Sequence, residues 1–153
     1  MHSSNWRGHL RDYIDFLEQK YALSPQEIRQ ELLAVRIPAG IYNSPNTPLQ
    51  VTAKYLQAEK NYTLPELAET LNRTPAEVKQ LLKKTIGELG KPTGPRISTA
   101  VFSDRALSAS EHLVEQLDAQ AISTNEIAEI LGKDPQTIYT LRRRAQQKRG
   151  ETQ

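Results

Sequence analysis

One short stretch of the chain carries side chains with the chemistry to bind a nucleic acid. Arg142, Arg143 and Arg144 are consecutive, and the stretch from Gln136 to Arg149 contains no acidic residue. A guanidinium group binds a phosphate, or the edge of a guanine, through two parallel hydrogen bonds. The Gln136 amide can pair with adenine in a similar way. The stretch therefore predicts contacts to phosphates and bases, and the alternative is that its charges only complement a helix dipole and stay solvated.

Residues suited to other kinds of chemistry are scattered along the chain. His2, His9 and His112 have no carboxylate or histidine at the spacing of a zinc site. The absence of cysteine excludes disulfides and thiolate metal sites. The segment GELGKPTGP, residues 87–95, lacks the preceding strand and the lysine-serine pair of a phosphate-binding loop. We therefore expect no metal, no cofactor and no enzymatic activity.

Length and charge set further limits on the function. The 153 residues are enough for one ordinary domain or a few very small ones. The net charge of +2 does not by itself indicate a nucleic-acid partner, so the distribution of charge has to carry that prediction. No apolar run has the length of a membrane span or of a signal peptide. We expect a soluble, cytoplasmic protein that does not contact membranes.

The sequence contains an internal repeat. A shift of 60 positions aligns residues 63–84 with residues 123–144 without a gap, and also aligns RIPAGIY, from Arg36, with RISTAVF, from Arg96. The shift gives six identities in the longer segment: Glu66 with Glu126, Ala68 with Ala128, Glu69 with Glu129, Leu71 with Leu131, Pro75 with Pro135 and Leu81 with Leu141. We expect two copies of one unit, at 36–86 and 96–150, joined by a glycine- and proline-rich linker at 87–95.

Each copy predicts two short helices that meet at a three-residue corner. Apolar residues recur at helical spacing, as at Ile127, Leu131 and Ile138. Asn72 and Gly132 are residue types that end helices, and Thr74 and Asp134 are N-caps that precede a proline suited to the first helical position. Glu77 is placed to complete a capping box with Thr74. A small residue, Ala68 or Ala128, permits the second helix to cross closely over the first. This combination is typical of a helix-turn-helix.

Both copies resemble the tandem helix-turn-helix DNA-binding proteins, such as the promoter-reading region of bacterial sigma factors and small transcriptional regulators. They depart from the commoner pattern at Arg73 and Lys133, where many such motifs have an apolar residue. In these families the outer face of the second helix contacts double-stranded DNA. The resemblance places Gln136, Thr137, Thr140, Arg143 and Arg144 on that face in the second copy, with Arg142 added by its charge, and Ala76, Glu77, Lys79, Gln80 and Lys83 in the first.

The first copy is the weaker candidate for a DNA contact. Glu77 lies where a reading helix would approach phosphates, and its carboxylate would repel them. The first copy is therefore a candidate for a protein partner instead. The alternative function is an adaptor whose helix-turn-helix units are a scaffold for a polymerase subunit, an ATPase or a larger assembly. RNA is less favoured, because the chain offers few exposed aromatic side chains for stacking.

The first 35 residues do not repeat the unit. The segment SPQEIRQEL, from Ser24, has a capping box but places Arg29 where the small crossing residue would be, so residues 1–35 predict a helical hairpin of another kind. An apolar stripe at helical spacing favours a packed core, and its alternative is a homodimer contact; the stripe consists of Trp6, Leu10, Tyr13, Ile14 and Leu17.

The segments RIPAGIY and RISTAVF carry enough β-branched residues for one short strand each. Two such strands can pair as a small ribbon across the copies. We favour instead two extended lead-ins that pack Ile41, Tyr42, Val101 and Phe102 against the helices. The sequence therefore predicts an all-α protein with two tandem helix-turn-helix units behind an N-terminal helical hairpin.

Overall fold

The computed structural model describes residues 6–22, 24 and 35–151. The chain divides into two units, Met1–Ala34 and Val35–Gln153. In the first unit, α1 spans Trp6–Tyr21, as the apolar spacing predicts. The second helix of the expected hairpin lies outside the described residues except for Ser24. The same holds for the side chains of the apolar stripe other than Ile14, so the proposed homodimer contact also lies outside them.

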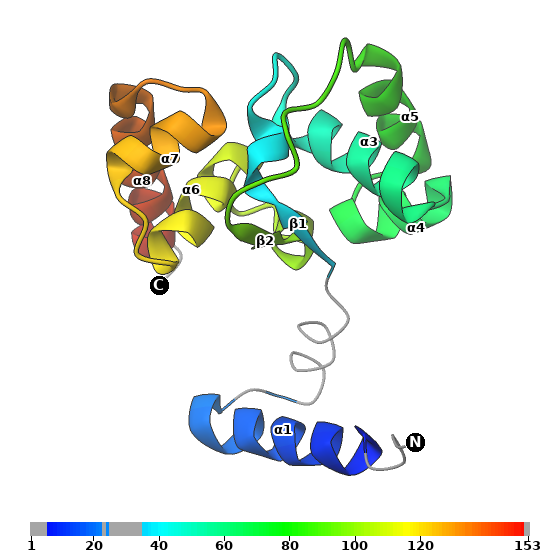
Figure 1. Cartoon of the computed structure of the whole chain (residues 1–153), viewed down its shortest axis with the longest axis vertical. Coiled ribbons are helices and arrows are strands. Elements are labelled where there is room, and N and C mark those ends of the chain that lie inside the picture. The colour runs from blue at the N-terminus through cyan, green and yellow to red at the C-terminus, as the bar shows by residue number, and fades with distance from the viewer. Residues whose placement is uncertain (1–5, 23, 25–34, 152–153) are drawn as a thin grey trace. The chain divides into compact units, whose positions relative to one another are not determined.

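The second unit is mainly helical and contains the same order of elements twice (Figure 1). In each copy a short strand leads into a 3-10 helix, and three α-helices follow. The first copy consists of β1 (Arg36–Pro38), η1 (Ala39–Tyr42), α3 (Pro48–Lys60), α4 (Leu64–Leu71) and α5 (Pro75–Lys84). The second copy consists of β2 (Arg96–Ser98), η2 (Thr99–Ser103), α6 (Ala109–Ala119), α7 (Thr124–Leu131) and α8 (Pro135–Glu151).

The corners between the last two helices of each copy form as their sequences predict. Asn72 and Gly132 follow α4 and α7 in the left-handed conformation, with φ of 52° and 67°. The side chains of Thr74 and Asp134 accept hydrogen bonds from the main-chain N–H groups three residues later, at 3.1 Å in each case. These bonds satisfy N–H groups that have no partner within the helix. The conformation of each corner is therefore determined by residues that are close to it in the sequence.

The capping box expected at Glu77 is wrong. The Glu77 carboxylate does not return to the Thr74 main chain and instead lies 3.8 Å from Arg73 Nε. A charge four residues away offers the carboxylate an ion pair that competes with the cap. Complete boxes occur at other helix starts, and these join Thr47 with Gln50, Thr63 with Glu66, and Ser108 with Glu111.

The two lead-in segments pair as an antiparallel ribbon, which corrects our preference for unpaired extended chain. Ile37 lies opposite Ile97, and both are fully buried. Buried main-chain groups need hydrogen-bond partners, and the other copy supplies them. The expected packing does occur in the residues that follow: Ile41, Tyr42 and Phe102 are buried in the core, although Val101 is only partly buried.

The register of the ribbon relates the two copies by an approximate two-fold axis. The shift of 60 positions that aligns the copies maps Ile37 onto Ile97, its own pairing partner. The flanking pairs, Arg36 with Ser98 and Pro38 with Arg96, change places under the same shift. A pairing that is unchanged when the copies are exchanged is the signature of a two-fold relation. The axis passes between the two isoleucines.

The copies also exchange contacts with one another. Helix α4 of the first packs on η2 of the second, and α7 packs on η1. Asn72 Nδ2 donates a hydrogen bond to the main-chain oxygen of Ser103 at 3.0 Å. At the equivalent place in the other half, the Asn43 side chain lies so close to Gly132 that it would have to shift to admit a Cβ there. Both copies contribute side chains to one core, among them Leu56, Leu71, Val78, Leu117, Leu131 and Ile138.

The connection between the copies, residues 87–95, is hydrogen-bonded to η1. The N–H groups of Ala39 and Gly40 donate to the carbonyl oxygens of Pro95 and Thr93, each at 2.8 Å, and Gly90 N donates to Ile41 O at 2.9 Å. At Gly40 an added Cβ would overlap the carbonyl oxygens of Lys91 and Thr93. The second copy has Ala100 at the equivalent position. Gly40 is therefore required by the path of the connection.

We expect Gly40→Ala to lower the free energy of unfolding by about 1–3 kcal/mol, because the connection must shift to admit the methyl group. Without the overlap, a glycine-to-alanine change outside the left-handed region would stabilise the fold by about 0.4–1 kcal/mol. The sign of the change in the free energy of unfolding, measured by urea denaturation, therefore tests whether residues 87–95 follow this path. Ala100→Gly is the matched control, with an expected loss of about 0.5–1 kcal/mol from backbone entropy alone.

Candidate nucleic-acid interface

Helix α8 carries most of the residues that the sequence predicts for a nucleic-acid contact, and one of its faces packs on α6. On that face the Arg142 guanidinium makes two hydrogen bonds to the Asp118 carboxylate, at 2.7 and 2.8 Å. These bonds raise the pKa of Arg142. The guanidinium carbon also lies 5.5 Å from the centre of the Tyr139 ring. Arg142 is therefore committed to an intramolecular contact.

The packed face continues toward the end of α8. Lys148 Nζ donates to Glu111 Oε1 at 2.7 Å, and Arg149 donates to both oxygens of Glu115 at 2.7 and 3.1 Å. Ala145 is buried in the middle of this face. We call these three ion pairs, Arg142–Asp118, Lys148–Glu111 and Arg149–Glu115, the α6–α8 seam. Their order requires the two helices to run antiparallel.

Glu111 is the most buried charge of the seam, with 3% of its side chain exposed. Burial raises the pKa of this carboxyl, but hydrogen bonds from Lys148 and from the Ser108 main chain outweigh the burial and hold the pKa below its ordinary value. Removing one of these donors would leave the buried carboxylate poorly compensated and destabilise the fold. Much of the basic C-terminal stretch thus has a structural role that the stretch alone does not reveal.

Arg143 and Arg144 lie on the other face of α8 and are exposed. Neither side chain makes a hydrogen bond or an ion pair with the part of the chain that the structure describes. The helix continues to Glu151, so the two arginines are not in its last turn. Complementing the helix dipole, which acts within the last turn, therefore does not account for them. Their charge is available to a partner.

The residues at the start of α8 differ in their exposure and in the hydrogen bonds that they can make to a ligand. Gln136 is exposed, whereas Thr137 and Thr140 are half-buried. The Thr140 hydroxyl donates to the Gln136 main-chain oxygen at 3.0 Å, which leaves only its acceptor capacity for a ligand. The Gln136 amide is accordingly the best placed of the three for a hydrogen bond to a base.

The second helix of the first copy presents a similar set. Lys79, Gln80 and Lys83 are exposed on α5, and so is Lys84, which was not among the residues predicted from the sequence. The 60-residue shift maps Lys83 and Lys84 onto Arg143 and Arg144, and this correspondence was the signal for Lys84. Equivalent places on the two second helices therefore carry adjacent exposed cations.

The charge of Glu77 is partly balanced at the first corner. Besides lying near Glu77, Arg73 donates hydrogen bonds from Nη1 to the main-chain oxygens of Leu71 and Asn72, at 2.9 and 3.2 Å. Burial lowers the pKa of Arg73, and the nearby positive charge of Arg105 lowers it further. The Arg73 guanidinium thus lies beside the Glu77 carboxylate. The repulsion expected of Glu77 toward phosphates is correspondingly reduced.

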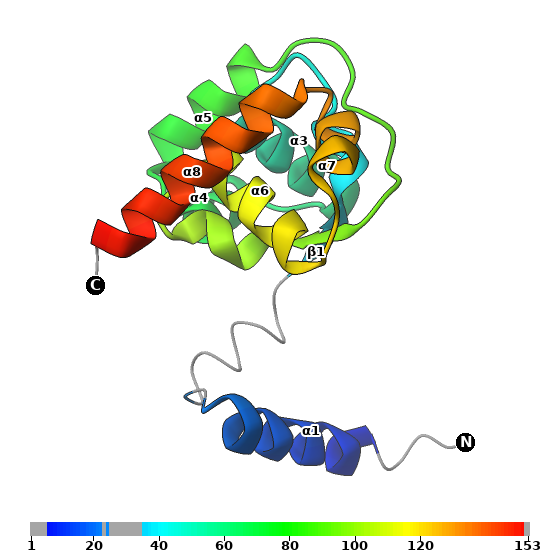
Figure 2. The same cartoon turned by 90° about the vertical axis from the view of Figure 1, so that its left-hand side faces the viewer.

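The two second helices stand apart on one face of the unit. Figure 1 shows α5 and α8 on opposite sides of the ribbon, and in Figure 2 both lie to the left of β1. The ribbon and the reciprocal packing of α4 and α7 fix this arrangement.

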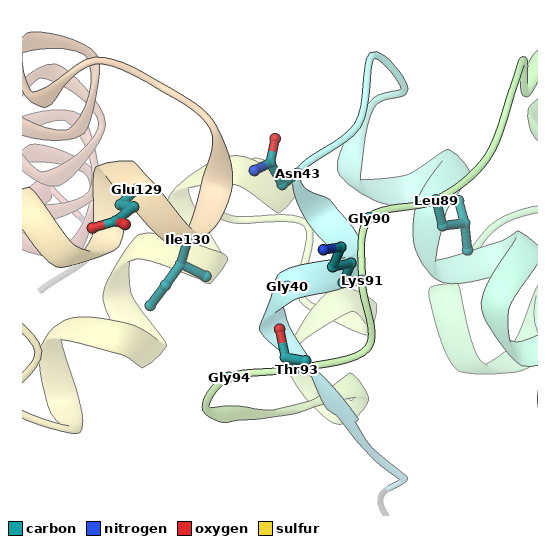
Figure 3. Close-up of a pocket in the computed structure, with 9 residues that line it drawn as sticks. All are labelled: Gly40, Asn43, Leu89, Gly90, Lys91, Thr93, Gly94, Glu129 and Ile130. Carbon is teal, nitrogen blue, oxygen red and sulfur yellow. The ribbon is translucent and has the colours of Figure 1, made fainter.

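A separate hollow of about 500 Å³ lies between the connection, η1 and α7 (Figure 3). Its polar side chains are those of Asn43, Lys91, Thr93 and Glu129, and the rest of its lining is mainly glycine backbone and the side chains of Leu89 and Ile130. It does not include any residue of the second helices. Across the described ranges, no three histidine or acidic side chains are grouped as metal ligands would be.

No protein-family model, curated protein or solved structure matched the chain. Among the helices that the structure describes, none has the length and apolar character needed to cross a membrane.

Proposed function

We propose that the protein binds double-stranded DNA through the outer faces of α8 and α5 and acts as a transcriptional regulator. The observation that carries the proposal is the pair of adjacent, exposed cations at equivalent places on the two helices, Arg143 with Arg144 and Lys83 with Lys84. Exposed cations on one face can supply the phosphate contacts from which much of the affinity of DNA-binding proteins comes. Gln136 adds a group that can read a base.

The local geometry of the corners supports this assignment. Each second helix follows a three-residue turn with a left-handed first residue. In the helix before each turn, Ala68 or Ala128 is buried. These are features of helix-turn-helix proteins, in which the second helix enters the major groove. Arg142 was expected from the sequence to contact DNA. Because its guanidinium instead binds Asp118 and holds α8 to α6, the proposal does not include it among the phosphate contacts.

The test is the salt dependence of binding to random duplex DNA, measured by fluorescence anisotropy. Removing one phosphate contact reduces the slope of log affinity against log salt by about 0.9. We expect the Arg143→Ala, Arg144→Ala double variant to bind more weakly to all sequences and to show a smaller slope. Lys54→Ala with Lys60→Ala is the matched control, because it removes the same charge from exposed positions of α3.

Two results would end the DNA proposal: no binding by the unaltered protein at low salt, or an equal weakening of binding in the arginine variant and in the α3 control. Gln136→Ala separates base reading from charge. It is expected to cost about 1–3 kcal/mol at a preferred sequence and nothing on random DNA.

One observation favours the adaptor as a second candidate function. Ile86, two residues after the end of α5, has 63% of its surface exposed. Nearby, α3 and the connection enclose a partly apolar groove lined by Tyr55, Ala58 and Leu89. An exposed apolar residue beside such a groove is a feature of protein-binding surfaces. If the adaptor is correct, Ile86→Ser abolishes capture of a protein partner and leaves binding to duplex DNA unchanged.

A further inference from the structure

We propose that one chain binds an inverted repeat in duplex DNA, with α8 in contact with one half-site and α5 in contact with the other. This inference rests on the proposed function and goes beyond it, because it names the symmetry of the DNA site and the number of chains that occupy it. Neither follows from DNA binding alone.

The symmetry is carried by the ribbon and by the packing across it. Ile37 pairs with its own equivalent, Ile97, in an antiparallel register that is unchanged when the copies are exchanged. Helix α4 contacts η2 as α7 contacts η1. These contacts relate α5 to α8 by the same approximate two-fold axis and prevent one copy from turning relative to the other.

Duplex DNA has two-fold axes of its own, perpendicular to the helix axis. Two protein surfaces related by a two-fold axis make equivalent contacts when the protein axis coincides with a DNA axis, and the half-sites are then inverted. A direct repeat would require the copies to be related by a translation and rotation along the DNA. The closed antiparallel ribbon does not permit that relation.

The two half-sites are predicted to differ in sequence. The cations are equivalent, since Lys83 and Lys84 correspond to Arg143 and Arg144. The residues placed to reach bases are not, because Ala76 corresponds to Gln136, and Gln80 corresponds to Thr140. Phosphate contacts fix the position of a protein on DNA, whereas base contacts set the sequence. We therefore expect symmetric backbone contacts on an imperfect inverted repeat.

The experiment begins with a duplex selected by the full chain from a random library. Hydroxyl-radical footprinting should show two protected patches related by a dyad, and the mass of the complex should correspond to one chain per duplex. The Arg143→Ala, Arg144→Ala variant should lose one patch, and the Lys83→Ala, Lys84→Ala variant should lose the other. Reversing one half-site, to give a direct repeat, should weaken binding by at least about tenfold.

The outcomes distinguish this inference from the proposed function. A single protected patch, two chains per duplex, or equal affinity for the direct repeat would overturn the inverted-repeat proposal while leaving DNA binding intact. A chain that selects no duplex at all would overturn both. The Lys54→Ala, Lys60→Ala control should keep both patches, and loss of a patch in that variant would contradict the assignment of the contacts to α5 and α8.

Discussion

Ile97→Ala is expected to lower the free energy of unfolding by about 2–5 kcal/mol, the range for truncating a fully buried aliphatic side chain. Ile97 and Ile37 face each other on the approximate two-fold axis, and both are completely buried. Removing the side chain leaves a cavity where the two copies meet, and the paired strands restrict how far the surroundings can close around it. Urea denaturation followed by circular dichroism measures the loss.

Ile97→Val is the matched control, with an expected cost of about 0.5–1.5 kcal/mol. Because the copies share one core, the alanine variant should still unfold in a single transition. A cost for alanine no larger than that for valine would show that the ribbon is not tightly packed at the axis. Two separate transitions would contradict a core common to both copies.

Lys148→Met should destabilise the protein at neutral pH by about 1–3 kcal/mol, the cost of leaving a buried charged group without one of its partners. Methionine keeps most of the aliphatic stem of lysine, so the change mainly removes the ammonium group that donates to Glu111. Thermal or urea denaturation at several pH values measures the effect.

The sign of the pH dependence follows from the lowered pKa of Glu111. A carboxyl with a lower pKa in the folded than in the unfolded state contributes stability above its unfolded value, near 4.5, and this contribution is lost as the pH falls through the folded value. Replacing Lys148 removes one of the groups that lower the pKa of Glu111, so this pKa should be higher in the variant than in the unaltered protein. The stability that the carboxyl contributes should then be lost at a higher pH.

Two further variants separate charge from packing at Glu111. Adding Glu111→Gln to Lys148→Met should restore much of the stability, because no buried charge then lacks its partner. Arg149→Met breaks the neighbouring pair with Glu115, whose side chains are both more than 40% exposed, and should cost only about 0–1 kcal/mol. An unchanged pH profile in the Lys148→Met variant would argue against the role assigned to the pair.

The features that could be predicted from the sequence are those with local causes. The corner at Gly132 depends on residues within one helical turn of it, and so do the caps at Thr74 and Asp134. The repeat was visible because both copies kept these local residues at a constant offset. The mainly helical fold follows from the same spacing.

The features that could not be predicted depend on residues distant in sequence. A three-residue strand such as RIP has no distinctive pattern of its own, and its partner lies 60 residues away. The interpretation of Arg142 required knowing that Asp118 is on the neighbouring helix. A weak signal was present: the acidic residues Glu111, Glu115 and Asp118 have the spacing of one helix face. The spacing alone does not say which helix covers that face.

The covalent connection along residues 87–95 has a consequence for how the protein behaves on dilution. Two separate subunits joined by such a ribbon would dissociate once their concentration fell below the dissociation constant. Here each half meets the other at an effective concentration on the order of millimolar or more, which does not change with the amount of protein. The two halves therefore remain paired at any protein concentration. A substitution also changes only one half, whereas in a homodimer it would change both.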